Sequence, residues 1–71
     1  MTTTGTDWIE AFAAQLSVEP PDAATIEMLL DLAGVAAHAS ERIAAPIACW
    51  LVGRAGLDPT ASLDIARSIT A

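Results

Sequence analysis

The sequence contains few basic and few aromatic residues. Among its 71 residues there is no lysine and no tyrosine, and three arginines stand against nine acidic residues, for a formal net charge of −6. Because nucleic-acid backbones and anionic membrane faces both attract basic surfaces, this charge argues against either as a partner. A chain of this length holds one small domain, near the size at which a single core barely offsets the entropy lost on folding.

Long apolar runs and pairs of cysteines are also missing. The longest interior stretch without charge covers residues 43–53 and contains Pro46, whereas a transmembrane helix needs about 20 apolar residues. We therefore expect no membrane insertion. Cys49 is the only cysteine and cannot form an internal disulfide, and the polar residues 1–6 do not resemble a secretory signal. These features favour a reduced, cytoplasmic protein.

Helical spacing of the apolar residues and many alanines predict an all-α protein, and prolines and glycines divide it into about four short helices. We expect a small bundle in which residues 1–6 form a flexible tail and residues 7–71 form one helical domain. The first helix is predicted to begin at Asp7, whose carboxylate would cap it, and to end before Pro20-Pro21. Its apolar stripe consists of Ile9, Phe12, Ala13 and Leu16, flanked by Trp8.

The second helix is predicted to begin near Pro21-Asp22 and to end at about His38 or Ser40. From Leu32 onward it is apolar on more than one side, which is typical of a helix that lies centrally in its domain or is covered by a partner. Its two stripes comprise Ile26, Leu29, Leu30, Ala33 and Ala37 on one side and Leu32, Val35, Ala36 and Ala39 on the other.

The remaining two helices have clear boundaries. Pro46 is well accepted only in a first helical turn, so a third helix is predicted from Ala44 to Arg54, with Gly56 ending it. The fourth helix is predicted to begin with Asp58 as its cap and Pro59 as its first residue. Apolar residues at helical spacing are Ile43, Ile47, Trp50 and Leu51 in the third helix, and Leu63, Ala66 and Ile69, with Ile65 adjacent, in the fourth.

Groups with catalytic or ligand chemistry are sparse. His38, the only histidine, lies at the end of the second predicted helix and could act as a general base or a ligand oriented by Glu41. The alternative, which we favour, is a histidine stabilised by the helix dipole and paired with Glu41. Cys49 is expected to be a buried apolar residue. We predict no enzyme activity, because the one histidine has no second ligand or nucleophile at fixed spacing and four short, alanine-rich helices can hardly enclose a ligand pocket. We predict no cofactor and no metal, because the sequence has no metal-binding pattern and no glycine-rich nucleotide loop.

The segment Ala61-Ser62-Leu63-Asp64-Ile65 resembles the serine motif that carries phosphopantetheine in acyl carrier proteins, which are also small, acidic and four-helical. In that family the serine opens the second helix, is usually preceded by aspartate and is followed by much of the domain. Here Ser62 follows an alanine, and nine residues come after it. We therefore disfavour the carrier interpretation.

A second resemblance covers roughly residues 7–56. It is carried by Trp8, Pro20-Pro21, the segments 29–33, 35–38 and 50–53, and most specifically by His38-x-x-Glu41-Arg42-x-Ala44-Ala45-Pro46. On these residues the chain resembles a small helical family of actinobacteria that occurs alone or attached to molybdopterin-guanine dinucleotide biosynthesis nucleotidyltransferases. Genes of that family often lie near formate dehydrogenase functions. The resemblance implies a role in molybdenum-cofactor biology without nucleotidyltransferase activity.

The apolar surplus of the second and third helices indicates an interface, because soluble monomers rarely expose large apolar patches. Joined with the resemblance, it predicts a non-catalytic accessory module that acts as a small subunit or maturation partner of a molybdenum enzyme such as a formate dehydrogenase. The alternative is a self-associating helical scaffold or regulatory homo-oligomer with no link to molybdenum. The residues expected at the partner interface are His38, Glu41, Arg42, Ile47, Trp50, Leu32 and Val35.

Overall fold

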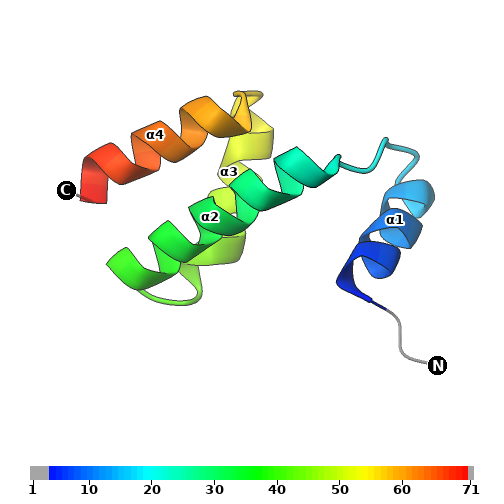
Figure 1. The fold of residues 1–71 in the computed structure, drawn as a ribbon, viewed down its shortest axis with the longest axis horizontal. Helices are drawn as coiled ribbons and strands as arrows, with labels where there is room; N and C mark the ends of the chain where they lie inside the picture. Colours follow the sequence, from blue (N-terminus) through cyan, green and yellow to red (C-terminus); the bar gives the residue numbers. More distant parts are fainter. Residues whose placement is uncertain (1–3, 71) are drawn as a thin grey trace.

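The computed structural model of the chain describes residues 4–70, which form four α-helices (Figure 1). In chain order these are α1 (Gly5–Gln15), α2 (Ala23–Ala39), α3 (Ala44–Ala55) and α4 (Pro59–Thr70). No β-strand occurs in this part of the chain. The prediction of a small all-α bundle of about four short helices is confirmed.

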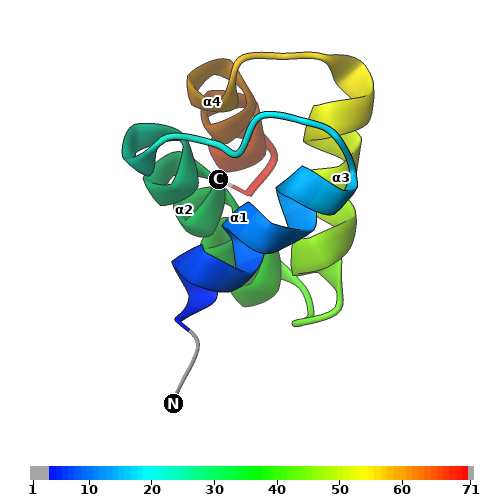
Figure 2. The ribbon, with the colours of Figure 1, turned by 90° about the vertical axis from the view of Figure 1, so that its right-hand side faces the viewer.

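Helix α2 lies at the centre of the fold. Both α3 and α4 pack against it, on two different sides (Figure 2). Leu32 of α2 and Leu63 of α4 are buried, and Thr60 Oγ1 of α4 donates a hydrogen bond to Met28 Sδ of α2 at 2.7 Å. The core is thin, because the only buried apolar residues within residues 4–70 are these two leucines and Ala13.

Helix α1 lies apart from the other three, beyond the N-terminal end of α2 (Figure 1). The extensive helix contacts in the described chain join α2 to α3 and α2 to α4, and none involves α1. The shape is therefore elongated, with extents of 41 × 26 × 18 Å and a Cα radius of gyration of 12.9 Å. A compact domain of this length has a radius of gyration of about 11 Å. Residues 16–22, which include Pro20 and Pro21, connect α1 to α2.

The start of α1 differs from the prediction. Thr4, not Asp7, is the N-cap, and its Oγ1 accepts a hydrogen bond from the Asp7 backbone N–H at 3.0 Å. A threonine hydroxyl can satisfy a free N–H of the first turn as a carboxylate can, so the helix begins at Gly5. Asp7 remains near the positive end of the helix dipole, where its charge is favourable. Gly5 and Thr6 thus belong to α1 and not to the predicted tail, whose residues 1–3 lie outside the described residues.

The other three helices begin where the sequence predicted. Asp22 caps α2, since its Oδ1 accepts the Thr25 backbone N–H at 2.8 Å. The backbone and side-chain hydrogen bonds from Thr25 lower the pKa of the Asp22 carboxyl below its usual 3.8. Helix α3 holds Pro46 in its first turn, where a missing N–H removes no helical hydrogen bond. Helix α4 begins at Pro59, and the carbonyl of Asp58 accepts a helical backbone hydrogen bond at 3.0 Å.

Residues in the left-handed conformation end two of the helices. Gly56 follows α3 with a φ of 69°, so the predicted end of that helix is confirmed to within one residue. Ser17 follows α1 with a φ of 60°, a conformation that costs a residue with a Cβ atom roughly 1 kcal/mol. The N–H groups of Ser17 and Val18 donate to the carbonyls of Ala14 and Ala13, which is the Schellman arrangement at a helix C-terminus.

Candidate interaction surface

An apolar groove opens between α3 and α4, with α2 as its floor. Its cavity volume is about 440 Å³, and a second hollow of about 250 Å³ continues it toward the α3–α4 connection. We call the two hollows together the α3–α4 groove. Its lining includes Leu32, Val35, Ala36 and Ala39 of α2, Ile47, Ala48, Leu51 and Val52 of α3, Leu57, and Ile65, Ala66 and Ile69 of α4.

The walls of the α3–α4 groove are exposed to solvent. Ile47 is 60% exposed, Leu51 54%, Ile65 53% and Ile69 83%, and contiguous apolar surface of this kind marks an interface. The apolar residues of α4 are divided between the core and the groove. Leu63 is buried, but Ile69 lies six residues further on and therefore on another side of the helix.

Helix α1 carries a second uncovered apolar surface, made of Trp8, Ile9, Phe12 and Leu16, which we call the α1 stripe. These side chains are between 36% and 58% exposed. The ring centroids of Trp8 and Phe12 are 5.0 Å apart with planes tilted by 32°, so the two rings form one continuous aromatic patch. The sequence pattern located this stripe, but gave no indication that the other three helices would leave it uncovered.

Three of the predicted interface residues line the α3–α4 groove, and a fourth, Trp50, lies on α3 outside its lining. Leu32, Val35 and Ile47 meet there, with Leu32 buried in the floor and Ile47 exposed on the wall. Trp50 is 62% exposed. It lines neither hollow of the groove.

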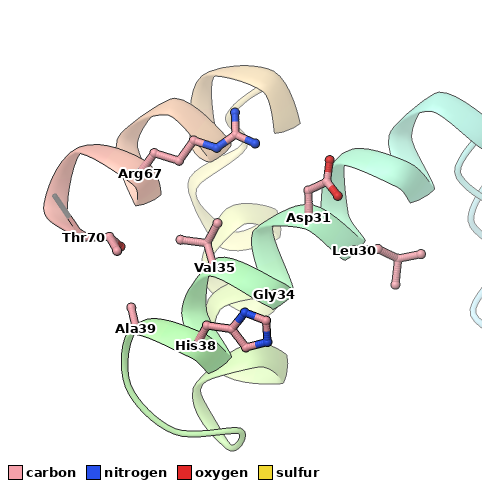
Figure 3. A pocket seen from close by; sticks show the side chains of 8 residues that line it. All are labelled: Leu30, Asp31, Gly34, Val35, His38, Ala39, Arg67 and Thr70. Carbon is pink, nitrogen blue, oxygen red and sulfur yellow. The ribbon is translucent and has the colours of Figure 1, made fainter.

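The other three predicted interface residues, His38, Glu41 and Arg42, are exposed near the C-terminal end of α2. His38 lies in the last turn of α2 as predicted, but within residues 4–70 no salt bridge joins it to Glu41, so the predicted ion pair is wrong. His38 lines a shallow hollow of about 590 Å³ between α2 and α4 (Figure 3). Asp31 and Arg67 lie at the far side of that hollow from His38. A catalytic arrangement requires side chains that converge on one point, and these exposed side chains do not.

A family comparison covers almost the whole chain. Residues 2–70 match a family described as a domain of unknown function, DUF6457. The chain belongs to this family. No curated protein and no solved structure matches it.

The DUF6457 domain offers no metal cluster among residues 4–70, where no group of three or more His, Cys, Asp or Glu side chains could hold an ion. In the same range no helix has the length and apolar character needed to cross a membrane.

Cys49 is a free thiol, half-buried where full burial was expected. Ser62 is buried, and its Oγ donates to the Asp58 carbonyl at 3.1 Å. A carrier serine must present its hydroxyl to solvent, so this geometry argues against the phosphopantetheine interpretation.

Proposed function

We propose that this DUF6457 domain is a non-catalytic protein-interaction module. The observation that carries the proposal is the pair of uncovered apolar surfaces, the α3–α4 groove and the α1 stripe, on a chain whose own core is thin. Removing apolar surface from water stabilises a complex by roughly 25 cal/mol per Å² before the costs of association. An amphipathic helix laid into an apolar groove is a recurring mode of recognition.

The partner we propose is a molybdenum enzyme, such as a formate dehydrogenase, or its maturation factor. This finer proposal is supported by the resemblance to the actinobacterial family, whose most specific part includes His38, Glu41 and Arg42. Trp50 would anchor the contact, because an exposed tryptophan on a helix is among the side chains that contribute most to interfaces. Arg42 would add a planar guanidinium that can form a bidentate ion pair with a carboxylate of the partner.

A pull-down of the tagged full chain from its native host, followed by native mass spectrometry and metal analysis, tests the proposal. We expect recovery in fixed stoichiometry with a molybdenum enzyme or with its immature apoprotein. Trp50→Ala and Arg42→Ala should each reduce that recovery while circular dichroism shows unchanged helicity. Arg54→Ala, which removes an exposed arginine in the last turn of α3, is the matched control.

Two outcomes of the pull-down would count against the proposal in different ways. Undiminished recovery with both Trp50→Ala and Arg42→Ala would contradict the proposed contact residues. Recovery of the chain with no molybdenum protein would contradict the proposed partner.

A further inference from the structure

We propose that the α3–α4 groove binds the α1 stripe of a second copy of this chain, so that two copies exchange their first helices in a two-fold dimer. The inference rests on the proposed interaction role: the second copy covers the groove and the α1 stripe, and Trp50 and Arg42, which line neither hollow of the groove, stay free for the larger partner. Each copy carries one uncovered apolar helix and one uncovered groove. A reciprocal exchange covers all four surfaces in a closed assembly and leaves none free to extend into a polymer.

The two surfaces match in size. Helix α1 has 11 residues and is about 16 Å long, and α3 and α4, the walls of the groove, each have 12 residues and are about 18 Å long. The exposed fractions of the α1 stripe correspond to roughly 400 Å² of apolar surface, given that a whole aromatic side chain carries about 150–250 Å². If fully covered, two stripes and an equal area of groove wall, which includes the exposed Ile47, Leu51, Ile65 and Ile69, would remove at most about 1,600 Å² from water, within the range of specific interfaces.

The position of the groove along α2 separates it from α1 of the same chain. The α2 residues that line the base of the groove begin at Leu32, about 15 Å along the helix from its cap at Asp22. The stripe of the same chain would meet the groove only if the connection folded α1 back along α2, whereas α1 lies beyond the N-terminal end of α2 (Figure 1).

The connection between α1 and α2 acts in the same direction. Pro20 and Pro21 fix their own φ angles, and each proline disfavours helical backbone in the residue before it, which keeps residues 19–21 extended. Figure 1 shows the result, with α1 held beyond the N-terminal end of α2 while α4 ends near the other end of α2. An apolar helix held away from its own groove is available to the groove of another molecule.

Charge favours the same pairing. Residues 1–41 hold seven of the nine acidic residues and no arginine, whereas residues 42–71 hold all three arginines. Helix α1 itself carries Asp7 and Glu10. Arg67 of α4 lies in the hollow beside the groove, and the two share lining residues. The lining of the groove itself is uncharged, and the neighbouring hollow holds one arginine, Arg67, together with Asp31. An acidic helix in the groove would therefore have Arg67 beside it, which favours its register, while apolar contact supplies the binding.

The test is disulfide cross-linking between two differently tagged full-length chains that are co-expressed, both with Cys49→Ala. One chain carries Phe12→Cys in the α1 stripe, and the other carries Ile69→Cys in the groove. Oxidation should give a mixed disulfide dimer, read by intact mass. Asp64→Cys, at an exposed position of α4 outside the groove lining, should give at least about tenfold less of it, since the two α4 positions lie on different sides of the helix.

The mass in solution provides a second readout, by size-exclusion chromatography with light scattering. The full chain should show a concentration-dependent dimer. Trp8→Ala should raise the dimer dissociation constant by about tenfold or more, because an aromatic anchor is lost. Trp50→Ala removes an equally exposed tryptophan that lines neither hollow of the groove, and should change that constant by less than about twofold.

Three results would overturn the exchange. The chain could remain monomeric at every concentration, or the dimer could be insensitive to Trp8→Ala, or Phe12→Cys and Ile69→Cys could cross-link within a single chain at high dilution. The last result would show that α1 closes on its own groove. In each case continued recovery of a larger partner would leave the proposed interaction role in place, whereas loss of both the dimer and the partner would remove that role as well.

Discussion

Helices α1 and α4 have nearly the same length and are both amphipathic, yet only α4 packs on the central helix. Helix α4 buries Leu63 and donates a hydrogen bond to a methionine of α2. Helix α1 buries only Ala13. The connections differ, because the short segment 56–58, with left-handed Gly56, turns α4 back toward α2, whereas residues 16–22 carry α1 away.

An amphipathic pattern therefore shows which side of a helix is apolar and favours burial. It does not show whether the same chain or another molecule buries that side. The short connections 40–43 and 56–58 bring α3 and α4 back onto α2, since elements joined by few residues usually lie near one another. An extended connection with two prolines leaves the helix uncovered by its own chain. The same physical pattern can thus build a core in one part of the molecule and an interaction surface in another.

The largest expected effect is on the packed helix. Leu63→Ala should lower the free energy of unfolding by about 2–5 kcal/mol, because it removes a buried leucine and leaves a cavity in a thin core. Phe12→Ala should lower it by less than about 1 kcal/mol in dilute, monomeric samples, since about half of that side chain is already exposed. Urea unfolding followed by circular dichroism measures both. Equal losses would show that α1 is packed as firmly as α4.

The next effect concerns the connection that carries α1. Replacing both prolines, Pro20→Gly with Pro21→Gly, should raise the apparent dimer dissociation constant about tenfold, because a flexible connection lets α1 compete for its own groove at high effective concentration. Glu19→Gly, which loosens one neighbouring residue and keeps both prolines, serves as the control. Light scattering across a dilution series measures the constant. No change in it would mean that the prolines do not direct α1.

Smaller effects of opposite sign are expected at the two left-handed residues. Gly56→Ala should destabilise the chain by about 1 kcal/mol, because alanine disfavours a positive φ. No atom lies within 4 Å of a Cβ atom built at Gly56, so this cost comes from the backbone alone. Ser17→Gly should stabilise α1 by a similar amount, since it removes the same strain. Thermal unfolding of both variants beside the parent chain gives the two signs, and two shifts of the same sign would refute this account of the helix ends.

The smallest expected effect is on the pH dependence of stability, through Asp22, the N-cap of α2. The hydrogen bonds from Thr25 lower the pKa of Asp22 below its usual 3.8, so the ionised cap favours the folded chain above that pH, and this contribution is lost as the pH falls through the lowered pKa. Asp22→Asn keeps a capping oxygen that does not titrate. Between about pH 6 and about pH 2.5, the urea midpoint should fall more in the parent chain than in Asp22→Asn. Equal falls would contradict a stabilising role for the ionised cap.

The breaks between the helices were predictable because prolines and glycines act through covalent geometry. Pro46, Pro59 and Gly56 each mark a boundary that the structure confirms. The start of α1 was harder to predict from the sequence than these boundaries, because Thr4 and Asp7 are both good N-caps. Capping at Thr4 adds helical hydrogen bonds, including that from the Trp8 N–H to the Thr4 carbonyl at 3.0 Å, and the longer helix forms.

The candidate site was predictable only in part. Leu32, Val35 and Ile47 were expected at an interface from their helical spacing, and the structure brings them together in the groove. The positions of Ile65 and Ile69 were not predictable, because they depend on how α4 is rotated about its own axis when Leu63 packs on α2. The uncovered state of the α1 stripe was missed for a similar reason, although Pro20-Pro21 was the signal that could have indicated it.

By itself the sequence determined an acidic, all-α chain with four helices, their approximate boundaries and a surplus of apolar residues. These are local properties, set by side-chain charge, by the fixed φ of proline and by the 3.6-residue period of the helix. Only the tertiary structure decided that the surplus forms a groove between α3 and α4 and a separate stripe on α1. Which apolar surfaces meet depends on helix rotation and on the path of the connections, and no local pattern specifies either.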